Sequence, residues 1–441
     1  MHAPVPPAKI TTRRVFAIAG PAMIANLTTP LIGIVSTAAI GRLSDATMLG
    51  GVAMASFLFD CLFWLFAFLR MGTLAFTAQA IGAGETDQLR LHLVRGLALS
   101  AVIGVGLIAL QAPLASILLR AMGGSDGVTA AARAYFGIRI WSAPLVLANY
   151  VLLGWLIGQA RAGLALSVQI AINLINMAAT TVLVLFLGMG ITGAAIAAVI
   201  AEASGLVIGV LIARRLSNGT LSVPRAALLD RVALTRMLNV NRDIMIRTAA
   251  LIAAFLFFTA QGARAGDVTL AANAVLNNFL LVSAFFLDGL ANAAEQLCGQ
   301  TLGARDRAGF ASATRLVVAW GSAFSFVVSI SFVVFGPALI DVMTTSDAVR
   351  ATAHNYLWFV AASPLLSVFA FAFDGVYIGA TWARDMRNLM IASLLIFLGT
   401  WFALRSFGNA GLWMAQLAHY AARGGLQAAR YPALLRKSFG K

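Results

Sequence analysis

Ionisable and amide side chains that interrupt long apolar runs are the residues of this sequence best suited to do chemistry. A carboxylate there can hold a proton or a cation, and an arginine can pair with it or with an anionic ligand. In the second half of the chain these candidates are Asp243, Arg247, Asn273, Asn277, Asp288, Glu295 and Asp374. At about 100° per residue, one run places Asn273, Asn277, Asp288, Asn292 and Glu295 within an arc of roughly 100° on one helix face. The other interpretation is structural: the acids pair with arginines, and Asp243 and Arg247, four residues apart, form an ion pair that anchors a helix end.

The first half of the chain differs because its candidate residues are mostly neutral. They are Pro21, Asn26, Ser36, Asp60, Asn149, Asn173, Asn176 and Thr180. Pro21 and Pro30 are expected to bend the first helix, since proline removes a backbone hydrogen bond and clashes with the preceding turn. A bent, polar-faced helix suits a gate, but hydroxyl and amide groups could equally join helices by hydrogen bonds. Asp60 and Glu202 are the carboxylates in these runs, and Glu202 is expected near one end of its helix, in a terminal role.

Other familiar chemistries are not indicated. The four histidines share no metal-ligand spacing, and Cys61 and Cys298 lie in apolar runs, so we expect neither a disulfide framework nor a metal site. No nucleophile and base stand out as a pair. Residues 82–85 lack both the preceding strand and the Gly-Lys-Ser/Thr of a phosphate loop. We therefore expect neither an enzyme activity nor a bound cofactor.

Composition shows what kind of elements must position these residues. Of the 441 residues, 61% are hydrophobic and 11% are charged, and the mean hydropathy is +0.90. A soluble domain has about 45–50% apolar and about 25% charged residues, so this chain has too few polar groups to cover a water-facing surface. The net charge of +15 comes from bases that punctuate the apolar runs rather than forming patches with interleaved aromatics. We therefore expect a polytopic membrane protein in contact with the lipid bilayer and no nucleic-acid partner.

The apolar runs predict an all-α fold of twelve transmembrane helices, since a helical span needs about 20 mostly apolar residues. The runs lie near residues 14–40, 48–81, 93–120, 133–159, 164–187, 191–214, 238–261, 269–302, 310–338, 351–379, 386–405 and 410–432. An even number of spans places both termini on one side of the membrane. Lys and Arg favour that side by roughly three to one, which predicts a cytoplasmic N- and C-terminus.

The two halves of the chain are related by an internal repeat. One constant offset pairs Gln79–Ala83 with Gln300–Ala304, Tyr135 with Tyr356, Gly154 with Gly375, and Gly158 with Gly379. Six spans per half give the two copies the same orientation, as in parallel-repeat transporters with a substrate site between the lobes. We predict an N-lobe at 1–214, a cytoplasmic linker at 215–237 and a C-lobe at 238–441.

Several motifs resemble those of the multidrug and toxic compound extrusion family, and more specifically its branch named for DNA-damage-inducible protein F. They are Phe68–Thr73, Thr77–Ala83, Asn241–Ile244, Phe258–Arg264, Ala271–Val275, Asp288–Gly289, Gly303–Asp306 and Phe373–Ala380. The resemblance runs from residue 13 to 435. It implies two six-helix lobes around a cleft that alternates between inward-open and outward-open states. It also implies export of organic compounds in exchange for H⁺ or Na⁺.

This chain departs from that branch at two positions. Where the branch commonly has an aspartate after the bend of the first helix, this chain reads Val35–Ser36–Thr37–Ala38. Where a second acid is often found on the fifth helix, Asn176 is followed by Thr180. Hydroxyl side chains cannot carry a proton cycle near neutral pH. Coupling is therefore expected through Asp60 or through the C-lobe acids.

These observations together predict a secondary antiporter of the bacterial inner membrane that exports amphipathic organic compounds by alternating access. The alternative is a flippase for a lipid-linked precursor, which would need a strongly cationic central cavity. A membrane-embedded transferase would need catalytic residues on large loops, and the longest connection, 215–237, is short. We expect a small organic substrate, H⁺ or Na⁺ as the coupling ion, and a monomer.

Overall fold

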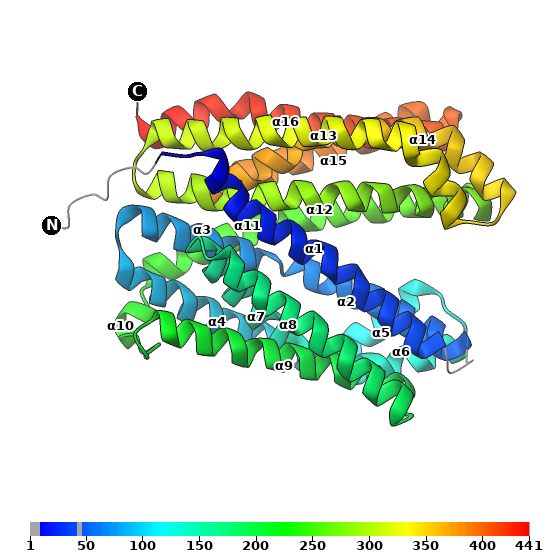
Figure 1. Cartoon of the computed structure of the whole chain (residues 1–441), viewed down its shortest axis with the longest axis horizontal. Coiled ribbons are helices and arrows are strands. Elements are labelled where there is room, and N and C mark those ends of the chain that lie inside the picture. Colours follow the sequence, from blue (N-terminus) through cyan, green and yellow to red (C-terminus); the bar gives the residue numbers. More distant parts are fainter. Residues whose placement is uncertain (1–8, 42–45, 441) are drawn as a thin grey trace. The chain divides into compact units, whose positions relative to one another are not determined.

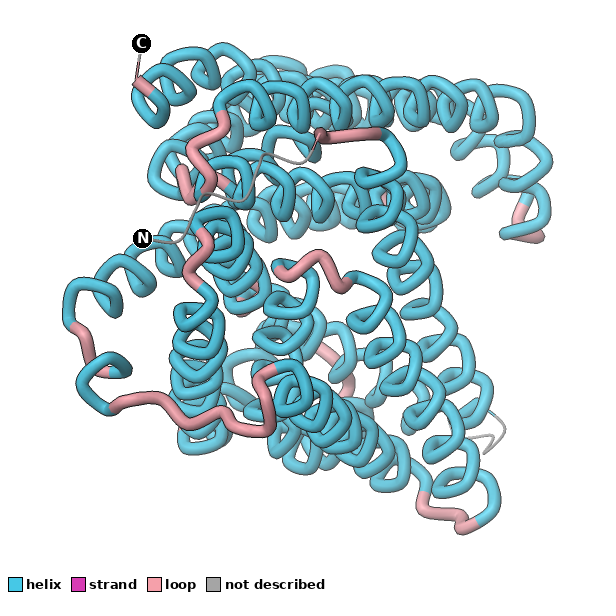
Figure 2. The backbone as a smooth tube through the Cα atoms, turned by 60° about the vertical axis from the view of Figure 1, so that its left-hand side comes forward, coloured by secondary structure: helices cyan, strands magenta, loops and turns pink. Residues whose placement is uncertain are grey.

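The computed structural model describes residues 9–41 and 46–440, without the side chains of 29, 34, 36, 37, 40, 41 and 46. Within these ranges every regular element is a helix, and the connections between helices are short (Figure 2). Eleven segments of the described chain are long and apolar enough to cross a membrane. The last long helix, α16 (Asn409–Phe439), is less apolar because its buried face carries Asn409, His419, Arg423 and Gln427. The chain is thus an all-α polytopic protein with the architecture that its apolar runs predict.

The chain folds into two compact units, which are described separately. Unit 1 comprises residues 1–23, 82–84 and 239–441, and unit 2 comprises residues 24–81 and 85–238. Three helices, α1 (Thr12–Gly41), α3 (Phe68–Ala83) and α11 (Arg231–Arg264), begin in one unit and end in the other. In α1 the change of unit follows Met23, directly after Pro21. The lobe boundaries given by the sequence analysis stay predictions.

Unit 2 holds the remaining helices of the first half. They are α2 (Ala46–Leu65), α3 (Phe68–Ala83), α4 (Thr86–Ala109), α5 (Gln111–Met122), α6 (Asp126–Arg139), α7 (Ala143–Gly158), α8 (Ala162–Thr180), α9 (Gly190–Leu216) and the short α10 (Arg225–Leu228). A 3-10 turn, η1 (Ile140–Ser142), joins α6 to α7, and α8 continues as a π-helical segment, η2 (Thr181–Phe186). The predicted third span is interrupted at Leu110, where α4 gives way to α5. α9 packs against α6, α7 and α8 (Figure 1).

Unit 1 holds the helices of the second half. Besides α11 and α16 they are α12 (Asp267–Gly303), α13 (Arg307–Met343), α14 (Asp347–Gly379) and α15 (Ala383–Leu404), with a 3-10 turn η3 (Arg405–Phe407). α14 packs against α12, α13 and α16, so it is the central helix of this unit (Figure 1). An apolar core that includes Phe258, Phe397 and Trp413 fills the space between these helices.

Glycines set the closest helix contacts, and they do so equivalently in both units. A Cβ at Gly154 would meet the backbone carbonyl of Arg70, and a Cβ at Gly158 would meet that of Leu74, so α7 lies directly on α3. In unit 1 the corresponding pairs are Gly375 with the Ala291 carbonyl and Gly379 with the Glu295 carbonyl. Each pair in unit 1 follows its counterpart in unit 2 by the same offset that relates the halves in sequence. The repeat is therefore present in the packing of the helices.

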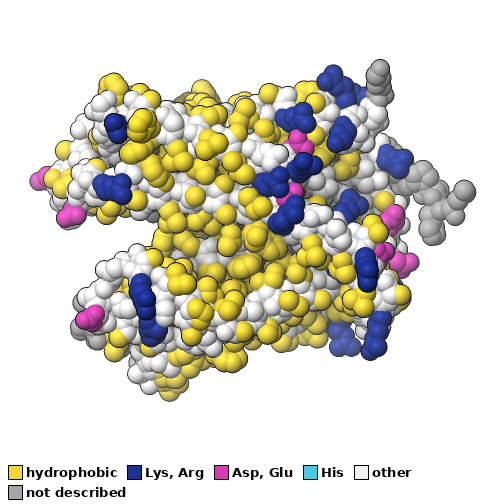
Figure 3. Space-filling model, turned by 180° about the vertical axis from the view of Figure 1, so that it is seen from behind, with side chains coloured by type: hydrophobic (Ala, Val, Ile, Leu, Met, Phe, Trp, Pro, Cys, Tyr) yellow, Lys and Arg dark blue, Asp and Glu magenta, His cyan; other side chains and the backbone are white. Residues whose placement is uncertain are grey.

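The outward faces of the helices are apolar. Large hydrophobic side chains such as Val102, Phe335 and Trp358 are mostly exposed. Figure 3 shows hydrophobic side chains over much of one face of the protein, with Lys and Arg gathered mainly toward one end of the helices. Such a surface is unfavourable in water and suited to lipid.

Candidate functional site

A buried ion-pair cluster joins three helices of unit 1. Asp374, on α14, forms ion pairs with both Arg247 on α11 and Arg423 on α16. The side chains of all three are at most 5% exposed. Gln427, one turn after Arg423, donates a hydrogen bond of 2.7 Å to the other oxygen of the Asp374 carboxylate. The two guanidinium groups thus compensate the charge of Asp374 from two different helices.

Two further acids of α12 belong to the same electrostatic cluster. Asp288 and Glu295 act on the guanidinium of Arg247, and Asp288 also acts on that of Arg423. Glu295 is buried, whereas Asp288 is exposed although it lies within a membrane-spanning helix. A charged side chain at such depth faces a water-filled space or other polar groups rather than lipid. The structure thus brings together four sequence candidates: Arg247, Asp288, Glu295 and Asp374.

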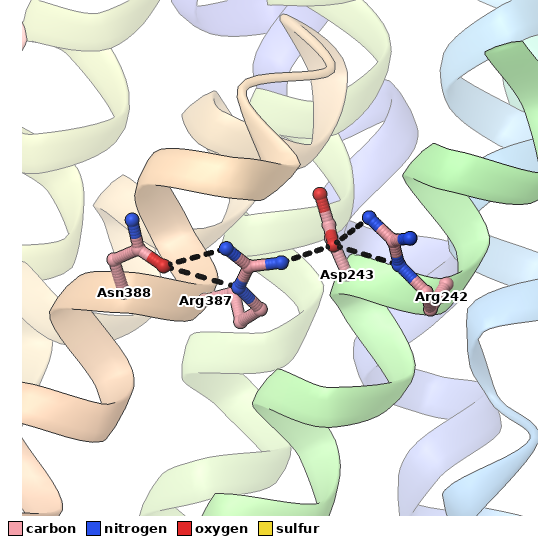
Figure 4. Close-up of polar contacts among 4 residues, drawn as sticks. All are labelled: Arg242, Asp243, Arg387 and Asn388. Atoms are coloured by element: carbon pink, nitrogen blue, oxygen red, sulfur yellow. Dashed lines mark hydrogen bonds and ion pairs between the residues drawn. The ribbon is translucent and has the colours of Figure 1, made fainter.

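Asp243 belongs to a separate ion-pair bridge (Figure 4). Its Oδ1 accepts a hydrogen bond of 2.7 Å from Nη1 of Arg387, on α15, and one of 3.2 Å from Nη2 of Arg242. Arg387 also donates from Nε and Nη2 to the side-chain oxygen of Asn388. The alternative interpretation of Asp243 and Arg247 as a pair is therefore wrong, because Asp243 pairs with Arg242 and Arg387, whereas Arg247 pairs with Asp374. This bridge ties α11 to α15.

Asn273 forms a third, fully neutral cluster. Its amide exchanges hydrogen bonds of 2.8 and 3.0 Å with the amide of Asn409, and its Oδ1 also accepts a 3.0 Å hydrogen bond from Trp413 Nε1. All three residues are buried. These contacts join α12 to α16 and explain why polar residues occur here in an apolar core. Asn277, one turn further along α12, is half-buried.

In unit 2, a chain of neutral side chains links α1 to α8. Gln169 donates to Oδ1 of Asn173 at 3.0 Å, and Asn173 donates to the hydroxyl of Thr28 at 2.8 Å. Thr28 in turn donates to the carbonyl of Ala25. Further along α8, the hydroxyl of Thr180 donates to Oδ1 of Asn176 at 3.4 Å. These contacts are those expected of hydroxyl and amide groups that join helices.

Glu202 is the polar residue that the sequence analysis placed wrongly. It lies near the middle of α9 rather than near an end, and its carboxylate accepts a 2.7 Å hydrogen bond from Nδ2 of Asn149 on α7. The same amide nitrogen donates to the Glu202 backbone carbonyl at 2.9 Å. The sequence does contain a feature that indicates this position: Glu202 lies far from both ends of an otherwise apolar run.

Asp60 and Glu202 share one base. Arg139, at the end of α6, interacts electrostatically with both carboxylates. Asp60 is exposed although it stands within a membrane-spanning segment, so we infer that it faces water rather than lipid. The sequence candidates Asp60 and Asn149 thereby fall in one polar cluster with Glu202.

The remaining first-half candidates lie on α1. Pro21 and Asn26 are half-buried on α1, which is helical through both of its prolines. The side chain of Ser36 lies outside the described residues. Among the described residues no group of three or more His, Cys, Asp and Glu side chains is placed to hold a metal ion.

The fold and these membrane-embedded charges define a transporter, and comparison with known proteins gives its family. The family model MatE matches residues 21–182 and 244–400, so the chain belongs to the MatE family of multidrug and toxin efflux transporters. It is 37% identical to the DNA damage-inducible protein F of Escherichia coli K12, over 92% of this chain and 89% of that protein. It is 27% identical to the probable multidrug resistance protein NorM of Caulobacter vibrioides, over 84% of this chain and 78% of that protein.

A solved structure shows the same fold. A MATE protein crystallised in its bent conformation superposes with a TM-score of 0.87 at 18% identity, covering 97% of this chain and 96% of that chain. The protein is therefore a multi-pass membrane transporter with the MATE architecture.

Proposed function

We propose that this protein is a secondary active antiporter that exports amphipathic organic compounds in exchange for H⁺ or Na⁺. The observation that carries the proposal is the presence, in each unit, of ionisable side chains within membrane-spanning helices. Unit 2 has Asp60 and Glu202 near Arg139, and unit 1 has Asp374 with its two arginines. Such groups are costly in a membrane and are retained where ions or substrates pass.

Exchange follows from differential binding. The cation and the substrate bind different conformational states of the transporter, or they compete for the same state. In either case the cation gradient can drive movement of the substrate. The similarity to a probable multidrug resistance protein supports organic substrates. The excess of Lys and Arg toward one end of the helices (Figure 3) supports cytoplasmic termini in a bacterial inner membrane. We propose that the transporter acts as a monomer and that it needs no cofactor besides the coupling ion.

The test is flux in proteoliposomes that contain the purified protein and the fluorescent amphipathic cation ethidium. An imposed H⁺ gradient or, separately, an imposed Na⁺ gradient should drive ethidium against its concentration gradient, and collapse of the effective gradient with an ionophore should stop it. Protein-free liposomes are the control. Ethidium movement that follows only its own gradient, whichever ion is imposed, would contradict coupled export of this probe.

A further inference from the structure

We propose that Glu202, which shares the base Arg139 with Asp60, takes up and releases the coupling proton in unit 2. This inference rests on the proposed function and specifies the residue that performs the coupling. A coupling residue other than Ser36 and Thr180 is needed, because the hydroxyl groups of these two residues do not ionise in the physiological pH range.

The position of Glu202 suits an exchangeable proton. It lies near the middle of α9, the helix that packs against α2, α6, α7 and α8. One turn further along, a Cβ at Gly205 would stand 3.1 Å from Nδ2 of Asn149, so the glycine leaves room for this amide to reach α9. Glu202 itself is only partly buried, which leaves a route for a proton.

Asn149 can serve both protonation states of Glu202. In the ionised state its Nδ2 donates to the carboxylate, as observed. Its Oδ1 is buried and makes no hydrogen bond within the described structure. When a proton binds, the new O–H of Glu202 can donate to this oxygen after rotation of the amide. Each state of the carboxyl group thus has a hydrogen-bond partner, and the only covalent change is the addition of one proton to a carboxylate.

The ionisable groups that interact with Glu202 or with its neighbour Arg139 lie on α2, α6 and α7. Arg139 and Tyr135 come from α6, Asp60 from α2 and Tyr150 from α7; Tyr150 is also within electrostatic reach of Arg70 on α3. α8, η1 and η2 contain no ionisable side chain. Arg139 is not within ion-pair distance of either acid, and its Nε is buried without a hydrogen-bond partner among the described residues. The guanidinium therefore favours a negative charge on either acid without fixing it on one of them.

Unit 1 shows the opposite arrangement at the equivalent position. The offset that pairs Gly154 with Gly375 pairs Glu202 with Arg423. In both units this residue contacts the helix of the fourth membrane span of its half. Glu202 accepts a hydrogen bond from Asn149 on α7, and Arg423 forms an ion pair with Asp374 on α14. In unit 2 the pair is a titratable acid with a neutral amide, whereas in unit 1 it is a permanent cation with an acid that a second arginine also holds. The exchangeable group is thus expected in unit 2.

The three glutamates of the chain, Glu85, Glu202 and Glu295, provide matched variants. Each is replaced by glutamine, and the full-length protein is studied in liposomes. The first readout is the infrared band of a protonated carboxyl group, recorded as the pH changes from about 5 to about 9. We expect wild type, Glu85→Gln and Glu295→Gln to show a band that Glu202→Gln lacks. This readout requires no transport, so it tests the site even if the proposed function is wrong.

The second readout is ethidium movement. A pH gradient should drive it at least about tenfold less in Glu202→Gln than in wild type. Ethidium exchange in the absence of any ion gradient should persist. Glu85, exposed at a loop, should behave as wild type after substitution. Glu202→Asp, which keeps a carboxyl group, should restore the band and part of the gradient-driven movement, and it serves as the test if Glu202→Gln fails to fold.

Several results would overturn the proposal. One is that Glu202→Gln keeps both the carboxyl band and pH-driven ethidium movement, or that Glu295→Gln loses pH-driven movement instead. Another is that folded Glu202→Gln loses ethidium exchange in the absence of a gradient. A third is that Glu202→Asp restores neither the band nor the movement. Absence of pH-driven movement in wild type would overturn the coupling role of Glu202. Absence of both H⁺-driven and Na⁺-driven movement would count against the proposed function, while the infrared band would still decide whether Glu202 titrates.

Discussion

Replacing Asp374 by alanine should lower the free energy of unfolding by about 3 kcal/mol or more, because removal of one partner from a buried ion pair typically costs about 3–5 kcal/mol. The variant leaves Arg247 and Arg423 buried without the carboxylate that they share, and it removes the acceptor of Gln427. We expect a loss of unfolding free energy toward the lower end of that range, because Asp288 and Glu295 still interact electrostatically with Arg247. Thermal unfolding of the purified protein, monitored by tryptophan fluorescence, measures the loss.

Asp347→Ala is the matched control for Asp374→Ala. Asp347 is an aspartate of the same helix, its side chain is 98% exposed, and its contact with Arg350 is 3.7 Å. An exposed pair contributes about 0–1 kcal/mol. A triple variant that replaces Asp374 by leucine and both arginines by methionine should regain much of the stability, since apolar side chains can replace a buried ion pair. Equal stability of Asp374→Ala and Asp347→Ala would show that the cluster is not a structural centre of unit 1.

The second large effect is expected at Gly379. An alanine there would place its Cβ against the backbone carbonyl of Glu295 and push α14 away from α12. A backbone atom cannot move aside as the end of a flexible side chain can, so we expect a loss of about 1–3 kcal/mol. The same measurement should show a loss for Gly158→Ala in unit 2, whose Cβ would meet the Leu74 carbonyl.

Gly399→Ala is the control for this overpacking. Gly399 is also within a helix, α15, but a Cβ there has nothing within 4 Å. Alanine favours a helix by about 1 kcal/mol over glycine, so this variant should be neutral or slightly stabilising. If Gly379→Ala matched it, the close approach of α14 to α12 would not be required for stability.

Much of the architecture follows from the sequence because lipid imposes simple requirements. Every backbone polar group must be satisfied within the membrane, so long apolar runs predict helices directly. The repeat of Gly154 and Gly158 as Gly375 and Gly379 was readable as well, and it reappears as equivalent helix contacts. The break at Leu110 was not predictable, because α4 and α5 form one continuous apolar run in the sequence.

The partners of the charged residues were harder to predict. Spacing within one helix favoured a pair between Asp243 and Arg247, but Asp243 contacts Arg387 and Arg247 contacts Asp374. Arg423 was not singled out, because the run 410–432 also contains other polar side chains, such as His419 and Gln427, and Arg423 does not stand out among them. Glu202 was expected near a helix end, although the predicted span 191–214 agrees closely with α9 and places this residue near its middle. Contacts between helices remote in sequence decide these roles, and a single sequence does not encode them in its periodicity.

The two halves of the protein share a backbone plan, and they carry opposite charges at the equivalent positions Glu202 and Arg423. Glu202 meets a neutral amide, and Arg423 meets a carboxylate that Arg247 also holds. A titratable acid suits proton exchange, whereas an ion-pair cluster suits a fixed support for three helices. This difference is the basis of our proposal that Glu202 couples transport to protons in a chain that has hydroxyl residues at Ser36 and Thr180.

Proton counter-movement driven by substrate tests the central claim most directly. Proteoliposomes with an internal pH-sensitive dye, no initial pH gradient and a potential clamped by potassium and valinomycin are exposed to external ethidium. In wild type, entry of ethidium should expel protons and raise the internal pH, and in Glu202→Gln ethidium should enter by exchange with no pH change. Ethidium entry with a constant internal pH in wild type, or an equal pH rise in Glu202→Gln, would contradict proton-coupled export through Glu202.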